Sequence, residues 1–300
     1  MAAEITTITD SRSPTLGKRL SGFAELTKPR IAILLVLTSA AGFYLASPEP
    51  VDLRLFLHSM AAIALLAFGV ATLNQYWERE LDVKMERTMG RPIQSSRVTS
   101  SQAVVFGVLL CVSAEVYLFS LVNTLTAVLG LIVIVGYLLL YTPLKTKTSA
   151  STAIGAVPGA LPPLMGWTAA ANEISLGAWA LFSIQFLWQF PHFLAIAWLY
   201  REDYAKAGIL MLPVVEPEGR ITARQIVLFA VMLFPVSLAP FFLQISSFIF
   251  LGVSVILSGW FLYESVSMAL KRTDASAKRL LLASVIYLPL LYLAMVLDRQ

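Results

Sequence analysis

Charged residues are scarce in this sequence. Only 13% of its 300 residues are Asp, Glu, Lys or Arg, whereas 58% are hydrophobic. Soluble globular proteins carry roughly 25% charged residues, and a single soluble core could not hide this much apolar surface. The composition therefore excludes an ordinary soluble domain and predicts an all-α, polytopic membrane protein.

Cysteine and histidine are also rare. The single cysteine, Cys111, lies in an apolar run. It excludes an internal disulfide and a metal site built from several cysteines. The net charge is only +4 and the sequence shows no internal repeat or low-complexity tract. We therefore predict no nucleic-acid partner.

Nine apolar runs are long enough to cross a bilayer. They are residues 31–47, 55–77, 102–121, 124–141, 152–170, 176–199, 226–244, 246–264 and 280–297. Residues 1–20 contain no apolar run and no signal-peptide core, so we predict a disordered cytoplasmic tail. Residues 21–300 are then a single transmembrane domain.

The basic residues lie almost entirely on one side of this arrangement. With the N-terminus in the cytoplasm, 20 of the 22 Lys and Arg residues are cytoplasmic, and only Arg54 and Arg299 face outward. Short cytoplasmic loops of membrane proteins carry an excess of Lys and Arg. This asymmetry predicts nine transmembrane helices with the N-terminus inside and places the two long loops, 78–101 and 200–225, on one cytoplasmic face. The tail favours the plasma membrane of a prokaryote.

A cluster of polar side chains directly follows the second apolar run. Asn74, Glu78 and Asp82 are spaced four residues apart, so they share one face of a helix that continues past the membrane. Stacked carboxylates repel each other unless a cation lies among them. Mg²⁺ prefers a few carboxylate oxygens together with phosphate and water oxygens, and Arg87 and Arg91 suit phosphate. The pattern predicts a Mg²⁺-bound diphosphate, and a solvated loop is the alternative.

A second cluster follows the sixth apolar run. Asp203 could supply a further metal-facing carboxylate, and Lys206, one helical turn later, could contact phosphate. A surface ion pair between these two residues is the alternative. The rings of Tyr200 and Tyr204 could stabilise a cation formed nearby or belong to the interfacial aromatic belt.

Two features inside the membrane indicate a central cavity. Pro158, Pro162 and Pro163 interrupt the fifth run, and such breaks are tolerated where they shape a cavity. His192 lies deep in the sixth run and faces the protein interior. It could bond a neighbouring helix or touch a polar or metal-bearing substrate.

These features favour one of two function classes. An intramembrane enzyme would hold a lipid-tailed diphosphate between the helices, and loss of the diphosphate would leave an allylic cation for an acceptor to attack. A transporter would use the acidic residues as ion sites, usually near the midplane, on broken helices and within repeats. Because the acids lie at helix ends and no repeat is visible, the enzyme is favoured.

Four motifs resemble one family. They are N-x3-E-x3-D-x2-M-x-R-T-x2-R-P from Asn74 to Pro92, D-Y-x2-A-G-x2-M-L-P from Asp203 to Pro213, W-Q-x-P-H-F from Trp188 to Phe193 and P-P-L-x-G-W from Pro162 to Trp167. This pattern resembles the protohaem IX farnesyltransferases, or haem O synthases, within the UbiA-like intramembrane prenyltransferases. The similarity spans roughly residues 20–298.

The resemblance implies nine transmembrane helices around a central cavity and a defined reaction. The farnesyl group of farnesyl diphosphate would be added to the 2-vinyl group of haem b, a substrate and not a cofactor, giving haem O and diphosphate. A UbiA-like enzyme acting on another aromatic or quinone precursor is the alternative. A haem A synthase or a terminal oxidase is implied as a partner.

The resemblance also assigns roles to residues. Asn74, Glu78, Asp82 and Asp203 would bind Mg²⁺ and, with Arg87, form the catalytic set. The residues that would contact substrate are Arg91, Lys145, Lys206, Tyr200, Tyr204 and His192. One departure concerns the second motif, which usually has two carboxylates four residues apart, whereas Ala207 stands at the second position.

Overall fold

The computed structural model describes residues 15–300, which form helices joined mostly by short connections, with a longer one over residues 83–99. The elements in chain order are α1 (Leu16–Leu26), α2 (Pro29–Ala46), α3 (Leu53–Trp77), α4 (Arg79–Asp82), α5 (Ser100–Leu121), α6 (Thr124–Ile134), the π-helix η1 (Val135–Tyr141), α7 (Thr142–Leu144), α8 (Ser151–Ala171), α9 (Leu176–Leu199), α10 (Arg201–Ala207), α11 (Leu212–Val215), α12 (Arg220–Phe242), α13 (Phe248–Lys271) and α14 (Asp274–Leu297).

Eight segments among the described residues are long and apolar enough to cross a membrane. They are α2, α3, α5, α9, α12, α13, α14 and the continuous stretch Thr124–Leu144 formed by α6, η1 and α7. The prediction of an all-α, polytopic membrane protein is therefore confirmed. The remaining predicted span, the fifth (152–170), corresponds to α8, which has 21 residues and no charge, but whose prolines and glycines lower its hydropathy below that of the others.

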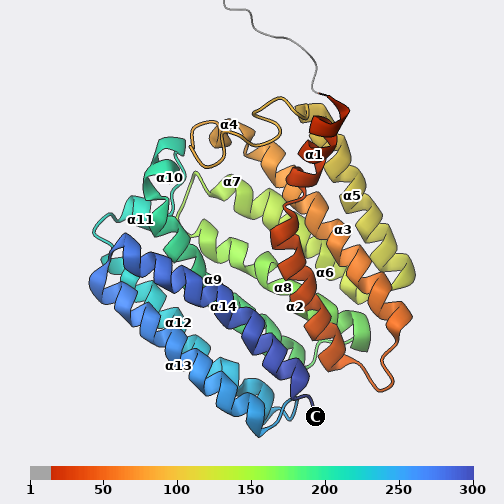
Figure 1. The fold of residues 1–300 in the computed structure, drawn as a ribbon. Helices are drawn as coiled ribbons and strands as arrows, with labels where there is room; N and C mark the ends of the chain where they lie inside the picture. Colours follow the sequence, from red (N-terminus) through yellow and green to blue (C-terminus); the bar gives the residue numbers. More distant parts are fainter. Residues whose placement is uncertain (1–14) are drawn as a thin grey trace, which may run out of the picture.

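The long helices lie side by side, with α8 and α9 at the centre (Figure 1). Helix α8 packs against α2, α6, η1 and α9, and α9 packs against α12 and α14 as well. The short helices α4, α7, α10 and α11 gather at one end of the bundle, and the C-terminus lies at the other end (Figure 1). The two long loops predicted to share a face therefore do lie at the same end.

Close contact between backbones joins α2 to α8. A side chain at Gly42 would meet the Pro163 carbonyl, and one at Gly166 would meet the Ser39 carbonyl. The Ser39 hydroxyl donates to the Pro162 carbonyl across this contact, at 2.8 Å. Small residues allow this approach between membrane helices. The prolines leave carbonyls one turn earlier without a donor, and the Gly159 carbonyl accepts instead from Gln185 Nε2 at 3.1 Å.

The segment before the first span is partly helical. Residues 1–14 of the predicted tail lie outside the described residues, but residues 16–20 belong to α1, where the sequence predicted disorder. The end of α1 is held by Leu26 and Gly22, which pack on Val98. Helix α1 therefore docks on the loop that follows α4.

Candidate active site

A cavity of about 820 Å³ opens at the end of the bundle that carries the short helices. Its walls come from α1, α2, the ends of α3 and α9, η1, α8 and the segment 209–211. Five basic side chains (Lys28, Arg30, Arg87, Arg91 and Lys145) and three acidic ones (Glu25, Glu78 and Asp82) line it, together with tyrosines 137, 141 and 204. The volume is in the range of ligand sites.

Three predicted acceptors lie one helical turn apart in this wall. Helix α3 ends at Trp77 and α4 begins at Arg79, so the helix breaks briefly at Glu78. The main-chain bonds from Glu78 N to Asn74 O and from Asp82 N to Glu78 O, both 2.9 Å, nevertheless keep the four-residue spacing. All three side chains are buried and line the cavity.

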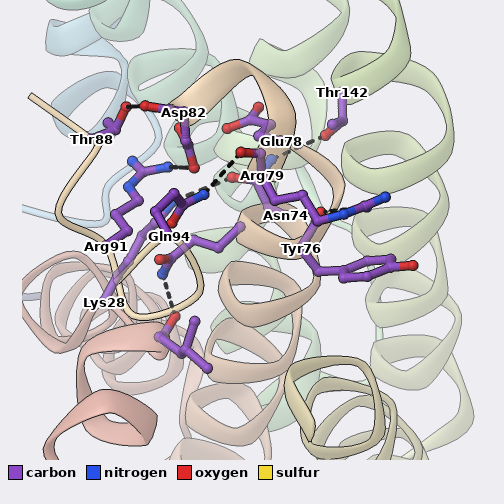
Figure 2. A network of polar contacts seen from close by, with 12 residues as sticks. Lys28, Asn74, Tyr76, Glu78, Arg79, Asp82, Thr88, Arg91, Gln94 and Thr142 are labelled. Atoms are coloured by element: carbon purple, nitrogen blue, oxygen red, sulfur yellow. Dashed lines mark hydrogen bonds and ion pairs between the residues drawn. The ribbon is translucent and has the colours of Figure 1, made fainter. Parts of the chain in front are cut away.

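Each acceptor has its own cationic partner, and Figure 2 shows the partners of Asn74 and Asp82. The Lys28 ammonium donates to Asn74 Oδ1 at 3.2 Å, and Arg91 Nη1 lies 2.6 Å from Asp82 Oδ2. Lys145 forms an ion pair with Glu78. Asn74 is oriented by its amide nitrogen, which donates to Thr142 Oγ1 at 3.2 Å.

The charges alter the protonation of these groups in different directions. Burial opposes ionisation of Glu78, but the nearby Lys145 and Lys28 outweigh it and hold its pKa at about 2. Burial and the charge of Arg91 lower the pKa of Lys28 to about 8. Burial raises the pKa of Asp82, although Arg91 opposes the rise. Glu78 is therefore ionised at neutral pH, whereas Lys28 titrates within one or two pH units of neutrality.

The donor set fits Mg²⁺ better than a metal held by protein alone. Within residues 15–300, no three His, Cys, Asp or Glu side chains gather into a metal site. Asp82 Oδ1, however, is buried without a hydrogen-bond partner. One unused carboxylate oxygen, a second carboxylate and an amide oxygen suit an ion that takes its remaining ligands from phosphate and water.

Part of the second motif lies beside this cavity and not in it. Asp203, Tyr200, Glu202 and Asp274 line a smaller neighbouring cavity of about 500 Å³. Asp203 lies 3.7 Å from Lys206, which also pairs with Glu86. The metal role of Asp203 and the phosphate role of Lys206 remain predictions.

Arg87 separates the two cavities. Its side chain lines both, and its guanidinium carbon lies 5.0 Å from the ring centre of Tyr200 and 6.0 Å from that of Tyr204. Tyr204 lines the larger cavity, whereas Tyr200 lines the smaller one. Arg87 therefore connects the loop after α4 to α10.

His192 points to a neighbouring helix. Its Nδ1 lies 2.7 Å from the Ser284 hydroxyl of α14, and its ring stacks on Trp188 with centroids 4.7 Å apart. It does not line either cavity described above. Of the two roles left open by the sequence, the helix–helix bond is the one that this geometry describes, and contact with substrate remains a prediction.

Several lining residues did not stand out in the sequence. Lys28 reaches the site because the chain adopts a left-handed conformation there, with φ of 48°, between α1 and α2. Tyr137, Tyr141 and Gln189 reach it from inside spans. In the sequence, these three residues could have been noticed as polar or aromatic side chains within apolar runs. Ala207, in place of the expected carboxylate, joins an apolar cluster with Met85, Ile209 and Met211.

Comparisons with known proteins agree with each other. A family model described as the UbiA prenyltransferase family matches residues 35–290. A protein named protoheme IX farnesyltransferase from Solibacter usitatus is 47% identical over 286 residues, covering 92% of this chain and 98% of the relative. One of the same name from Koribacter versatilis is 41% identical, covering 95% and 96%.

Solved structures are similar in fold. A structure described as digeranylgeranylglyceryl phosphate synthase in membranes superposes with a TM-score of 0.79 at 18% identity, covering 94% of this chain and 98% of that chain. A UbiA homolog from Archaeoglobus fulgidus bound to GPP and Mg²⁺ superposes with a TM-score of 0.67 at 15% identity, covering 92% and 99%. At these identities the likeness concerns the fold alone.

Proposed function

The chain belongs to the UbiA prenyltransferase family, and from this premise we propose that it transfers the farnesyl group of farnesyl diphosphate to the 2-vinyl group of haem b, giving haem O and diphosphate. The relatives named protoheme IX farnesyltransferase support both the donor and the acceptor. The family resemblance predicted from the motifs is confirmed, and the transporter alternative is set aside because the family is one of prenyltransferases.

The observation that carries this proposal is the charge pattern of the larger cavity. Carboxylate and amide oxygens face four cations, Lys28, Arg87, Arg91 and Lys145, beside an apolar and aromatic wall. A lipid-tailed diphosphate needs both halves of this cavity, because its head is anionic and its tail is apolar. Arginine and lysine neutralise the charge that grows on the leaving diphosphate.

The protein would bring the reaction about by holding charges in place. The allylic C–O bond breaks and its electron pair leaves with the diphosphate, which Arg87, Arg91 and Lys145 receive. The rings of Tyr137, Tyr141 and Tyr204, which line the cavity, would stabilise the positive charge on the farnesyl carbons. The vinyl π-electrons then form the new C–C bond and leave the positive charge on the vinyl carbon next to the porphyrin ring. Water adds to that carbon to give the hydroxyl group, and the proton that it releases passes to the departing diphosphate or to solvent.

Asn74, Glu78 and Asp82 would hold Mg²⁺, with Asp203 available for a further ion from the neighbouring cavity. When bound, the metal supplies Lewis-acid neutralisation of the diphosphate oxygens. Lys206 and Tyr200 would contact the diphosphate from the α10 side. The magnesium-bound structure of the Archaeoglobus fulgidus homolog supports a metal-dependent reaction in this fold.

The setting we propose is the plasma membrane of a prokaryote. The excess of basic residues on the end that carries the cavity supports cytoplasmic active-site loops. Lipid would surround the apolar helix faces, and a haem A synthase or terminal oxidase would receive the product.

One assay tests donor, acceptor and metal together. Purified enzyme is incubated with haem b, farnesyl diphosphate and Mg²⁺, with EDTA in the control, and products are identified by mass spectrometry. We expect a farnesylated haem only when the metal is present. Prenylation of 4-hydroxybenzoate without any haem product would instead support the other acceptor class.

A further inference from the structure

Every oxygen-bearing side chain predicted to bind the metal at the first motif already has a cation beside it. Lys28 contacts Asn74 at 3.2 Å, Arg91 contacts Asp82 at 2.6 Å, and Lys145 pairs with Glu78. The Glu78–Lys145 pair is well buried, with side chains 10% and 11% exposed, and Asp82 is completely buried. Metal and lysine or arginine would therefore compete for the same oxygens.

The net charge of the cavity acts in the same direction. Five basic and three acidic side chains line it, which leaves an excess of two positive charges. A bare divalent cation would add to that excess in a partly desolvated site. A metal–diphosphate complex keeps a net negative charge, so it would reduce the excess.

The three cations also have a second possible partner. Lysine and arginine both bind phosphate oxygens, arginine in a planar fork and lysine as a point charge. If the carboxylates turn to the metal while Lys145 and Arg91 turn to the diphosphate, no buried charge is left unpaired during the exchange. If only the metal binds, Lys145 and Arg91 lose their carboxylate partners, and if only diphosphate binds, the carboxylates lose their cations. Either loss is costly in a buried site.

We propose that Lys28, Arg91 and Lys145 act as resident counter-ions, so that the site binds divalent metal and diphosphate together, as one complex, and binds either alone only weakly. This inference rests on the proposed function, since it concerns the same donor substrate. Asp82 Oδ1 is buried without a hydrogen-bond partner, so a metal could bind this oxygen while the Arg91–Asp82 pair, which uses Oδ2, stays closed.

The test measures binding without turnover. Mn²⁺ alone, inorganic pyrophosphate alone and the preformed Mn²⁺–pyrophosphate complex are titrated into detergent-solubilised enzyme, with calorimetry for all three and electron paramagnetic resonance for Mn²⁺. In the wild type we expect the preformed complex to bind at least about 100-fold more tightly than Mn²⁺ alone.

Substitutions at one ion pair should have opposite effects on the two ligands. Lys145→Met frees Glu78, so we expect Mn²⁺ alone to bind about tenfold more tightly and pyrophosphate alone about tenfold more weakly. Glu78→Gln should do the reverse. Lys145→Gln, which can keep a hydrogen bond to Glu78, replaces Lys145→Met if the latter does not fold. Lys147→Met, in the same loop but away from the cavity, is the matched control and should change neither affinity.

The outcomes separate this inference from the proposed function. An enzyme that farnesylates haem but binds Mn²⁺ alone as tightly as it binds the complex would overturn the counter-ion role and leave the function intact. Equal losses of both ligands in Lys145→Met would also overturn it, because a merely structural lysine would weaken both. Absence of any binding of Mn²⁺–pyrophosphate, together with no farnesylated haem, would instead refute the function.

Discussion

At the scale of single residues, Asp82 is the side chain on which the metal site depends most directly. Asp82→Asn removes the charge but keeps the size and one oxygen, and Thr88 still bonds the main-chain carbonyl of residue 82 at 2.8 Å. We expect the fold to persist and kcat to fall about 100-fold or more, the size of effect seen when a key electrostatic group is removed.

The matched control for this variant is Glu80→Gln. Glu80 lies in the same short helix, and its exposed side chain pairs only with Arg79. Glu80→Gln should leave kcat within about twofold of the wild-type value, since an exposed ion pair contributes little to stability. Full Mg²⁺-dependent activity in Asp82→Asn would remove this carboxylate from the mechanism.

Lys28 predicts a pH dependence. Its pKa is lowered to about 8 from an ordinary value of 10.5, so between these values the unfolded chain binds the extra proton. Deprotonation of Lys28 therefore favours folding as the pH rises through this window. Diphosphate binding changes in the opposite direction, because the neutral amine no longer attracts the anion.

We therefore expect kcat/KM for farnesyl diphosphate to fall about tenfold per pH unit above pH 8, since this ratio reports the free enzyme. In Lys28→Arg the guanidinium stays charged, and the fall should begin at least one unit higher. A pH profile identical in both enzymes would assign the ionisation to another group.

At the scale of helices, the contact between α2 and α8 offers a stability test. Gly166→Ala places a methyl group against the Ser39 carbonyl, so the helices must separate. We expect a loss of about 1–3 kcal/mol in the free energy of unfolding, measured as a lower thermal midpoint in detergent. Gly259→Ala in α13 is the control: nothing lies within 4 Å of its added carbon, so this variant should be as stable as the wild type or slightly more so. Equal midpoints in the two variants would contradict the close packing.

The sequence predicted which segments are helices more completely than it predicted how those helices pack against one another. Eight of the nine predicted spans match helices that meet the membrane criteria, because apolar runs of this length have few other structures available. The four-residue spacing of Asn74, Glu78 and Asp82 was readable because it survives the break at Glu78.

Features that depend on long-range packing could not be predicted in the same way. Lys28 reaches Asn74 across 46 residues of sequence because α1 folds back through a left-handed residue. The direction of His192 depends on where α14 lies, and the separation of Asp203 from the larger cavity depends on the path of α10. No local pattern encodes these relationships, since each is set by contacts between distant segments.

At the scale of the whole molecule, orientation in the membrane can be tested with the native cysteine left in place. Cys111 is the only cysteine and is buried, so an introduced thiol gives the main labelling signal. Lys147→Cys, at the end that carries the cavity, should react with an impermeant maleimide only after the cytoplasmic side is exposed.

Glu173→Cys provides the opposite control. It is exposed and lies in the connection between α8 and α9, at the other end of α8 from Lys147. In cells whose outer membrane is permeabilised and whose plasma membrane is intact, Glu173→Cys should be labelled and Lys147→Cys should not. Reversal of the two labelling patterns would overturn the cytoplasmic assignment of the active-site loops.

The π-helix η1 has a consequence for any comparison or redesign of this chain. The main-chain N–H of Thr142 bonds the carbonyl of Tyr137, five residues back instead of four, so η1 holds one more residue than an α-helix would need for the same path. Deleting one residue there, such as Leu139 on the outer surface, would let the segment close into an α-helix, and the residues after it would keep their direction. Lys145 would then still face Glu78. Deleting one residue from a regular helix such as α3 would instead rotate everything after it by about 100°, so a single-residue gap is tolerable within η1 and disruptive elsewhere in the spans.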